Sequence, residues 1–303
     1  MTDRALDDFN VYADERRAQA YATLAFPGTY YLAYRDLPSI IARHAARGRA
    51  LDVLNGQSRD EGRQGPATLL PPFKTSRPRA RAGPANSVSG SSEEGCLDGL
   101  KPAALDLGCG AGRSTRFLRD LGFDAVGADI SAEMIRAARA LDPAGDYRLV
   151  GDGDYWALAG ERFDLVLSAF TFDNVPTPAQ KRRIMGSLRP LLSPGAPVVH
   201  IVSSPELYVH EWASFSTRDF PENRVAHDGD IVRTIILDTP DHRPVDDVLC
   251  GSACYREIFR DAGFSVDAVY RPLGQKDDPV DWVTETVIPP WTIYVLADAA
   301  RRR

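Results

Sequence analysis

The sequence predicts an α/β fold in which a parallel sheet is covered by helices on both faces. From residue 101 onward, short apolar runs alternate with stretches whose apolar residues recur at helical spacing. A glycine-rich turn follows the first of these apolar runs and leads into a helix. Hydrophobic residues make up 44% and charged residues 26% of the 303 residues, so the chain can bury a full core without disulfides.

The N-terminal residues 1–52 are predicted to form a helical cap. Residues 4–47 show helical spacing that Pro27-Gly28 interrupts as a turn, and a second helix is expected from about Leu37. The acidic N-terminus is typical of neither a signal peptide nor a transit peptide. No apolar run approaches the ~20 residues that a membrane span needs. We therefore expect a cytoplasmic protein without a membrane partner.

Residues 53–100 are predicted to be a disordered insertion. Between residues 55 and 99 the chain holds seven Gly, five Pro and six Ser, and its apolar periodicity disappears. Such a composition buries too little apolar surface to offset the entropy of ordering. The stretch Gly48–Val53 resembles a degraded copy of Pro102–Leu107. We interpret the segment as an insertion at the start of a strand.

The core is predicted to span residues 101–303. The expected strands cover residues 103–107, 124–129, 147–150, 163–168, 197–202, 265–270 and 291–297. The expected helices cover residues 114–121, 132–141, 178–192 and 252–262. The third helix has the clearest pattern, because five of its apolar residues recur at helical spacing. Residues 204–250, which follow the fifth strand, are rich in polar aromatic groups and are predicted to form a lid, called the lid segment below.

The first core strand runs into the motif Asp106-x-Gly108-x-Gly110-x-Gly112. Glycines here let the backbone turn sharply and let a ligand approach the main chain, while the new helix offers unpaired N–H groups. A dinucleotide fingerprint needs another glycine where this chain has Arg113, so an NAD-dependent reductase is only a distant alternative. The Gly-Lys-Ser/Thr ending of a phosphate-binding loop is absent.

Two further acids follow neighbouring strands. Asp129 closes the second strand, where a carboxylate can accept hydrogen bonds from both ribose hydroxyls. Asp152 follows the third strand and can accept one from an adenine amino group. A net charge of −6 disfavours nucleic acid as a partner, and four cysteines without a CxxC pair predict no metal site.

In these motifs, residues 101–203 resemble the class I S-adenosylmethionine-dependent methyltransferases. DLGCGAG resembles their first motif, the end of GFDAVGADIS their ribose-binding acid, and LVGDGD their adenine-binding loop. FDLVLSAFTFDNV resembles their fourth motif, and LRPLLSPGAPVVHIV the helix and strand after it. The resemblance implies a doubly wound, Rossmann-like sheet of seven strands. Their implied order is 3-2-1-4-5-7-6, with the last strand antiparallel, N-terminal helices and a lid after strand five.

The resemblance implies S-adenosylmethionine as the cofactor and assigns the contacts of its amino-acid end. Gly108, Gly110 and Gly112 would line the methionine portion, and Asp106 would orient that loop. Ser168 and Phe170, after the fourth strand, would face the amino-acid end and the transferred methyl group.

The nucleoside end of the cofactor is assigned in the same way. Asp129 would hold the ribose hydroxyls, and Ile130 would flank the adenine. Asp152 would hold the adenine amino group, with the N–H of Gly153 nearby.

The function implied is methyl transfer to a small-molecule acceptor. Oxygen acceptors usually need a base, and His210 beside Glu211 is the leading candidate, with His200 and Asp173 as alternatives. Many small-molecule members carry a histidine after the fourth motif, where this chain has Asp173-Asn174. A SAM-cleaving or SAM-cyclising enzyme therefore stays open, as does a non-catalytic SAM-binding protein.

Overall fold

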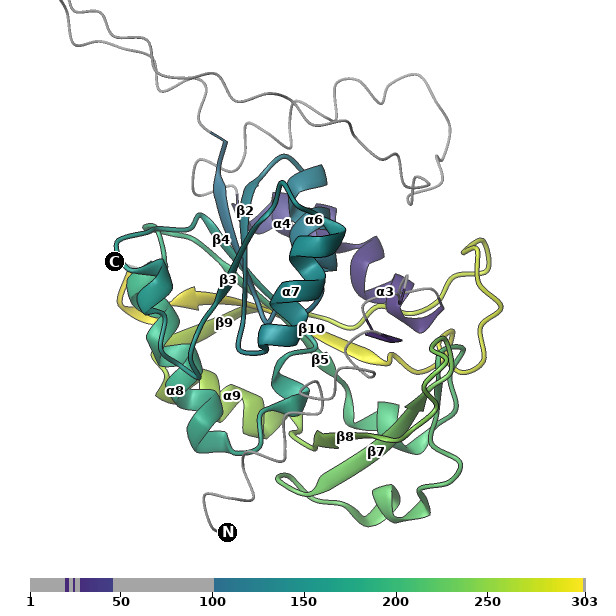
Figure 1. Cartoon of the computed structure of the whole chain (residues 1–303). Coiled ribbons are helices and arrows are strands. Elements are labelled where there is room, and N and C mark those ends of the chain that lie inside the picture. The colour runs from purple at the N-terminus through teal and green to yellow at the C-terminus, as the bar shows by residue number, and fades with distance from the viewer. Residues whose placement is uncertain (1–19, 22–23, 25–27, 46–100, 302–303) are drawn as a thin grey trace, which may run out of the picture.

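A seven-stranded sheet forms the centre of the computed structural model, which describes residues 20–21, 24, 28–45 and 101–301 (Figure 1). The strands are β1 (Ala103–Leu107), β2 (Asp124–Asp129), β3 (Asp146–Leu149), β4 (Leu165–Ala169), β5 (Val198–Ser203), β9 (Phe264–Tyr270) and β10 (Trp291–Asp298). Their order is β3-β2-β1-β4-β5-β10-β9. Strands β1 to β5 pair in parallel, and β10 is antiparallel to both of its neighbours. This confirms the predicted order and the antiparallel last strand.

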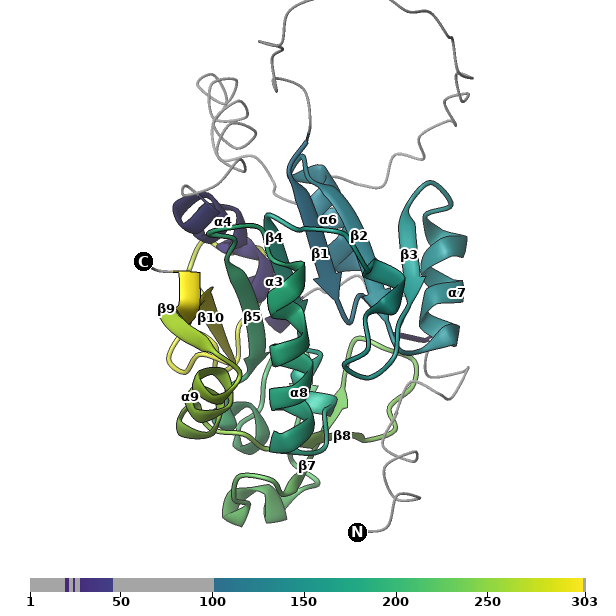
Figure 2. The same cartoon turned by 90° about the vertical axis from the view of Figure 1, so that its left-hand side faces the viewer.

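Helices cover both faces of the sheet. They are α3 (Thr29–Arg35), α4 (Leu37–Ala45), α6 (Arg113–Asp120), α7 (Ala132–Leu141), α8 (Pro178–Leu188) and α9 (Ser252–Asp261). One apolar cluster joins α3, α4 and α6 to the sheet, and a second joins α8 and α9 to its other face. Helix α7 packs beside β2 and β3 (Figure 2).

The central strands are apolar because both of their faces are buried. In β1, Ala104 belongs to the first cluster and Leu105 to the second. In β4, Leu165 likewise belongs to the first cluster and Val166 to the second. Such strands read as continuous apolar runs, which is why their bounds were predictable from the sequence to within two residues.

Helix α8 begins as predicted and ends earlier. Thr177 caps its start, with its side-chain oxygen accepting a hydrogen bond from the Gln180 N–H at 3.2 Å, and Pro178 is its first residue. The α-helix stops at Leu188, and a 3₁₀ turn covers Arg189–Leu191. The predicted continuation to residue 192 fails because Pro190 has no N–H to donate to the preceding turn.

The lid segment contains a small sheet of its own. Its elements are the 3₁₀ turns η4 (Pro205–Val209) and η5 (Pro221–Val225) and the strands β6 (Phe215–Ser216), β7 (Ile231–Ile236) and β8 (Val245–Val248). The three strands pair antiparallel in the order β6-β7-β8 and lie beyond the end of β5, green in Figure 1. Trp212, Phe215 and Val232 join the same apolar cluster as α3 and α4.

A buried carboxylate fastens three segments together. Glu285, with no exposed surface, accepts hydrogen bonds from the Thr29 hydroxyl at 2.6 Å and the Ala213 N–H at 2.8 Å. The Thr29 N–H donates to Ser214 Oγ at 2.9 Å, and Trp291 Nε1 donates to the Thr29 carbonyl at 2.8 Å. The start of α3, the lid segment and the loop before β10 therefore meet at one node.

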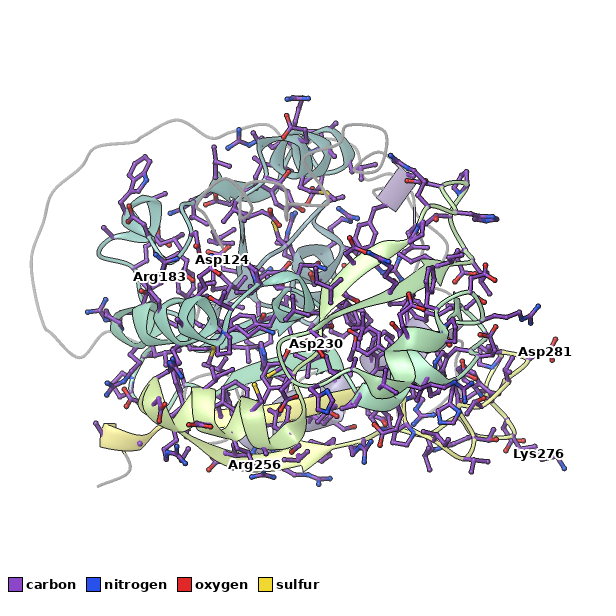
Figure 3. The ribbon with its side chains drawn as sticks, turned by 90° about the horizontal axis from the view of Figure 1, so that it is seen from below. Asp124, Arg183, Asp230, Arg256, Lys276 and Asp281 are labelled. Carbon is purple, nitrogen blue, oxygen red and sulfur yellow. The ribbon has the colours of Figure 1, made fainter. Side chains whose placement is uncertain are left out.

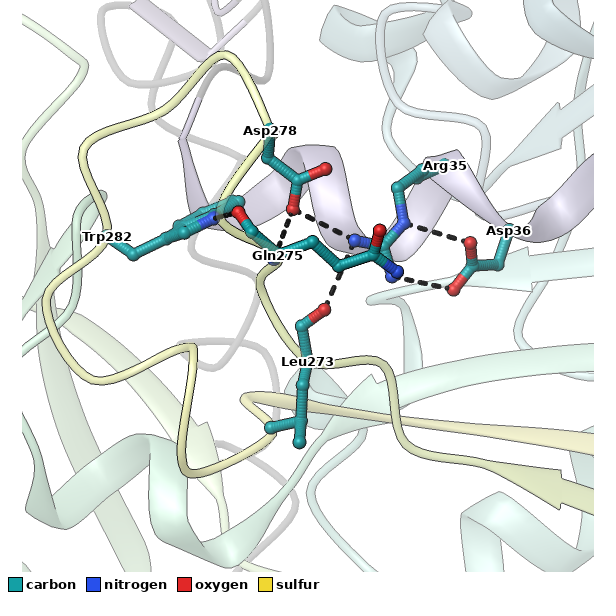
Figure 4. A network of polar contacts seen from close by, with 6 residues as sticks. All are labelled: Arg35, Asp36, Leu273, Gln275, Asp278 and Trp282. Carbon is teal, nitrogen blue, oxygen red and sulfur yellow. Dashed lines mark hydrogen bonds and ion pairs between the residues drawn. The ribbon is translucent and has the colours of Figure 1, made fainter.

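The loop between β9 and β10 is held on the side of α3. Arg35 donates from Nη1 to Asp278 at 2.9 Å and to the Leu273 carbonyl at 3.1 Å (Figure 4). Lys276 and Asp281 extend from the outer part of this loop (Figure 3). The anchor fixes the base of the loop and leaves its tip exposed.

The predicted disordered insertion, residues 53–100, lies outside the described residues, as do residues 1–19 and 46–52 of the predicted cap. Within the described part of the chain, no helix is both long enough and apolar enough to cross a membrane.

Candidate functional site

A cavity of about 440 Å³ lies at the carboxyl ends of the central strands. Its walls come from the glycine loop after β1, the end of β2, the turn after β3 and the residues after β4. The chain order reverses here, because β1 lies between β2 and β4. Open α/β sheets bind ligands in this crevice. Most of the predicted cofactor residues meet here, namely Gly108, Gly110, Asp129, Ile130, Asp152, Gly153 and Phe170.

The glycine loop needs its glycines for two different reasons. Gly108 has φ 72°, and a Cβ there would lie 2.2 Å from Thr171 Oγ1, so the loop packs directly against the segment after β4. Gly110 has φ 51°, and a Cβ there would have Met134 and Tyr21 as nearest neighbours, both at 4.0 Å. Both neighbours line the cavity, so the bare backbone at Gly110 leaves its space to a ligand.

Gly112 does not line the cavity. A Cβ at this position would lie 2.5 Å from the Tyr147 ring, so the glycine makes room for a core side chain. The structure therefore gives Gly112 a packing role in place of the predicted ligand contact.

Asp129 joins the second strand to the glycine loop. Its Oδ2 accepts a hydrogen bond from the Gly110 N–H and its Oδ1 one from the Ser131 N–H, both at 2.8 Å. Burial raises the pKa of this carboxyl group, and the two amide donors partly oppose the rise. Each carboxylate oxygen accepts more than one hydrogen bond, so Asp129 keeps acceptor capacity for a ligand. Beside it, Ile130 is 55% exposed and lines the cavity.

Asp152, in the turn after β3, also lines the cavity and is contacted from α8. It pairs with Arg183, and Gln180 Nε2 donates to its Oδ2 at 3.4 Å. Gly153 follows with φ 69°, which turns the chain at the cavity edge. A carboxylate and a backbone N–H are thus presented side by side.

Asp106 lies in β1, next to the glycine loop, and does not line the cavity. It is fully buried, and its Oδ2 accepts hydrogen bonds from the hydroxyls of Ser114 at 2.7 Å and Thr115 at 2.6 Å. Burial raises the pKa of Asp106 to about 6. These bonds fix the first turn of α6 against β1, and the role of orienting the loop stays a prediction.

The two residues predicted after strand four differ. Phe170 lines the cavity in a left-handed conformation (φ 61°) that costs a non-glycine residue of order 1 kcal/mol or more. Its ring packs against Trp291 at 4.7 Å and Tyr30 at 5.4 Å. Ser168 lies inside β4, is fully buried and does not line the cavity. Neighbouring strands cover it on both sides.

The predicted bases do not reach the cavity. His210 is absent from its lining, and its backbone carbonyl accepts a hydrogen bond from the Thr217 hydroxyl at 2.9 Å. His200 lies within β5 with no exposed surface, 4.4 Å from the Phe172 ring, and burial lowers its pKa to about 3. A buried imidazole enclosed by aromatic rings exchanges no proton with a ligand in the cavity.

Asp173 also belongs to the interior. Its Oδ2 accepts hydrogen bonds from the Ser203 N–H at 3.0 Å and the Ser203 hydroxyl at 2.8 Å. Burial raises its pKa, and the charge of the buried Lys181 lowers it. This carboxylate fastens the segment after β4 to the end of β5 and is 5% exposed.

Several cavity residues were not predicted from the sequence. They include Tyr21, Met134, Tyr155, Asn174 and Gln180. Asn174 also contacts the lid segment, because its Nδ2 donates to Asp247 Oδ1 of β8 at 2.6 Å. Its place near the end of the fourth motif was a signal for Asn174, whereas the others carry no pattern that separates them from packing residues.

Comparisons with known proteins find methyltransferases among the sequences similar to this chain. A family profile described as a methyltransferase domain matches residues 104–195. The ubiquinone biosynthesis O-methyltransferase of Cereibacter sphaeroides is 38% identical over 99 residues, which cover 31% of this chain and 38% of that protein. The malonyl-[acyl-carrier protein] O-methyltransferase of Enterobacter lignolyticus is 41% identical over 64 residues, covering 21% of this chain and 25% of that protein. The chain thus spans well under half the length of these relatives.

Solved structures share the fold. The DhpI-SAM-HEP complex superposes with a TM-score of 0.50 at 17% identity, over 98% of this chain and 100% of that chain. A SAM-dependent methyltransferase from Methanosarcina mazei gives a TM-score of 0.46 at 16% identity, over 65% of this chain and 92% of that chain. At 17% identity, the likeness to the DhpI complex shows a common architecture and no more.

Proposed function

We propose that this chain, which carries a domain of the class I S-adenosylmethionine-dependent methyltransferases, transfers a methyl group from that cofactor to a small-molecule acceptor. One observation carries the proposal. The glycine loop, Asp129 and Asp152 surround a single cavity of about 440 Å³ at the point where the strand order reverses. The O-methyltransferase names of the relatives in ubiquinone and malonyl-carrier chemistry support the reaction class.

The residues of the cavity fit this cofactor. The open backbone at Gly110 suits the methionine portion, and the spare acceptor capacity of Asp129 suits two ribose hydroxyls. The exposed side chain of Ile130 offers an apolar surface to an adenine ring. Asp152 and the N–H of Gly153 offer an acceptor and a donor to its edge. When bound, the cofactor supplies an electrophilic methyl group on a sulfonium sulfur.

The chain contributes alignment and exclusion of water. Phe170 and its aromatic neighbours form a rigid wall next to the glycine loop. Among the described lining residues there is no histidine, lysine, arginine or cysteine. Catalysis by proximity and orientation is consistent with such a lining, because a reactive electrophile needs chiefly a correctly aligned nucleophile.

The decisive test of the cofactor assignment is calorimetric titration of S-adenosylhomocysteine into Asp129→Ala. We expect affinity to fall about tenfold or more, because hydrogen bonds to a charged acceptor are worth ~1.5–3 kcal/mol each. Asp124→Ala is the matched control, since Asp124 is exposed and begins β2, whereas Asp129 ends it. Equal affinity of wild type and Asp129→Ala would refute the assignment.

Product analysis then separates methyl transfer from the alternatives. Incubation with S-adenosylmethionine alone is expected to yield no methylthioadenosine, whereas a SAM-cleaving enzyme would release it. Formation of S-adenosylhomocysteine only when a metabolite extract is added would support transfer to an acceptor. Tight binding without turnover in any extract would instead indicate a non-catalytic SAM-binding protein.

A further inference from the structure

Asn174 lies at the boundary between the cofactor cavity and the lid segment. It ends the 3₁₀ turn η2 (Phe172–Asn174) that follows β4, and it lines the cavity. Its Nδ2 donates to Asp247 Oδ1 at 2.6 Å and approaches the Asp246 carbonyl at 3.4 Å. Both acceptors belong to β8, so the amide is oriented by the lid segment.

The orientation of this amide follows from the chemistry of its partners. A carboxylate and a carbonyl oxygen only accept hydrogen bonds, so the NH₂ group of Asn174 must face β8. Its Oδ1 then points away from β8, and no partner for it occurs among the described residues. Among the described residues, the amide oxygen of this cavity-lining side chain therefore has no hydrogen-bond donor of its own.

Asp247 is itself held rigidly. It is 8% exposed, and its Oδ2 accepts a hydrogen bond from the Tyr208 hydroxyl at 3.1 Å. Its other oxygen receives the Asn174 amide. Because both oxygens are engaged, rotation of the Asn174 amide would set its oxygen against a buried carboxylate, which electrostatic repulsion opposes.

The charge of the cavity adds a second constraint. Its described lining contains the carboxylates of Asp129 and Asp152 and no cationic side chain, and the nearby Arg183 is paired with Asp152. A carboxylate acceptor would find no counterion among the described residues that line this cavity, and a charge without a partner is costly to desolvate. A group with a polar hydrogen instead finds the oxygen of Asn174.

We propose that Asn174 accepts a hydrogen bond from the attacking N–H or O–H group of the methyl acceptor, and that Asp247 is the residue that positions it. The acceptor is accordingly an amine, phenol or alcohol and not a carboxylate. This inference rests on the proposed function. The acceptor's lone pair forms the new bond to the methyl carbon, the carbon–sulfur bond breaks with its electron pair left on sulfur, and the acceptor's proton leaves to water.

Two cofactor analogues test the geometry without a known acceptor. Sinefungin carries an amine where the cofactor carries its methyl sulfonium, whereas S-adenosylhomocysteine has only a thioether there. Calorimetry measures the affinity of each analogue for Asn174→Ala. We expect the affinity for sinefungin to fall about tenfold relative to wild type, and the affinity for S-adenosylhomocysteine to change by no more than a factor of about two. Gln180→Ala is the matched control, because it removes another lining amide beside Asp152 and should shift both ligands together.

The positioning role has its own variant. Asp247→Asn replaces one accepting oxygen by an amide that also donates, so the Asn174 amide is free to turn over. In this variant, the ratio of the affinity for sinefungin to the affinity for S-adenosylhomocysteine should be lower than in wild type. Circular dichroism and the melting temperature check that the lid segment still packs.

The outcomes separate the inference from the proposed function. If wild type binds neither analogue, the proposed function fails. If wild type binds both and Asn174→Ala leaves their affinity ratio unchanged, the function stands and the role of Asn174 is refuted. Mass spectrometry of products from a metabolite extract tests the acceptor class. Methyl amines or ethers are expected, and methyl esters as the main product would overturn it.

Discussion

Asp106 shapes the site although it does not contact the cavity. Its Oδ2 accepts hydrogen bonds from Ser114 and Thr115, which fixes the start of α6 relative to β1. Its Oδ1 is buried with no partner among the described residues. Asp106 therefore orders the start of α6, but its charge is buried, which is unfavourable. Buried ionisable groups of this kind are typical of functional sites.

That cost has a measurable pH dependence. Burial raises the pKa of Asp106 from 3.8 to about 6. Between these values the folded state binds more protons than the unfolded state, so the free energy of unfolding falls as the pH rises. The full fall is about 3 kcal/mol. Asp106→Asn should lack this step, and urea unfolding of both proteins at about pH 4 and pH 8 measures it. Parallel pH profiles for the two proteins would contradict the burial argument.

Asp247 should make the Asn174 contact sensitive to pH. Burial and the nearby charge of Asp173 raise the pKa of Asp247 to about 7, while Tyr208 and Lys181 act in the opposite direction. Below that pH the protonated carboxyl no longer requires the amide NH₂ of Asn174. We expect the preference for sinefungin to decline as the pH falls through this range, and to stay constant in Asp247→Asn. A preference that declines equally in that variant would exclude Asp247 as the origin.

Part of the cavity lining was predictable, because the chemistry of these residues is encoded at or near the strand ends. Asp129 ends β2, the glycine loop begins directly after β1, and Asp152 lies three residues after the end of β3. The sheet order brings them together. The positions of His210 and Asp173 relative to the cavity were not predictable, because they depend on packing between segments that are distant in sequence. The carboxylate of Asp173 accepts hydrogen bonds from the N–H and the hydroxyl of Ser203 in the next strand, and no local sequence pattern indicates this pairing.

At the scale of elements, the lid segment was predicted without its strands. Strand β7 alternates exposed and buried residues, but β6 has two residues and β8 has four. Elements this short carry little periodic signal. Their stability comes from contacts outside the segment, such as Phe215 against Trp291 at 5.7 Å.

The Glu285 node should control the docking of these elements. Glu285→Ala leaves the Thr29 hydroxyl and the Ala213 N–H without their acceptor. Each buried unpaired donor costs about 1–3 kcal/mol, so we expect the free energy of unfolding to fall by about 3 kcal/mol. Glu285→Gln keeps one accepting oxygen, so its free energy of unfolding should fall by less. Glu222 is exposed, and Glu222→Ala should change the free energy of unfolding by under about 0.5 kcal/mol. Urea denaturation compares the three, and equal loss in the two Glu285 variants would argue against the hydrogen bonds as the cause.

At the scale of the whole molecule, the lid segment contributes a small sheet, and the seven-stranded sheet with helices on both faces organises the rest of residues 101–301. In the seven-stranded sheet, β1 pairs with both β2 and β4, so Ala103–Leu107 joins the β2–β3 side of the sheet to the rest. Helix α4 and the start of β1 lie at the same end of the sheet in both views (Figures 1 and 2). A direct connection between them is therefore compatible with the fold.

Deletion of residues 53–106 tests whether the chain works without its predicted insertion. The deletion joins Leu51-Asp52 to Leu107-Gly108, so Ala50, Leu51 and Asp52 supply the residue types of the lost strand positions. We expect the variant to fold and to bind S-adenosylhomocysteine within about tenfold of wild type, because the buried apolar pair and the Asp106 acceptor are reproduced. Deletion of residues 103–106 alone is the control and should not fold, because it removes the centre of the sheet. If both deletions abolish the cooperative thermal transition, residues 53–102 are required for the fold and are not an insertion.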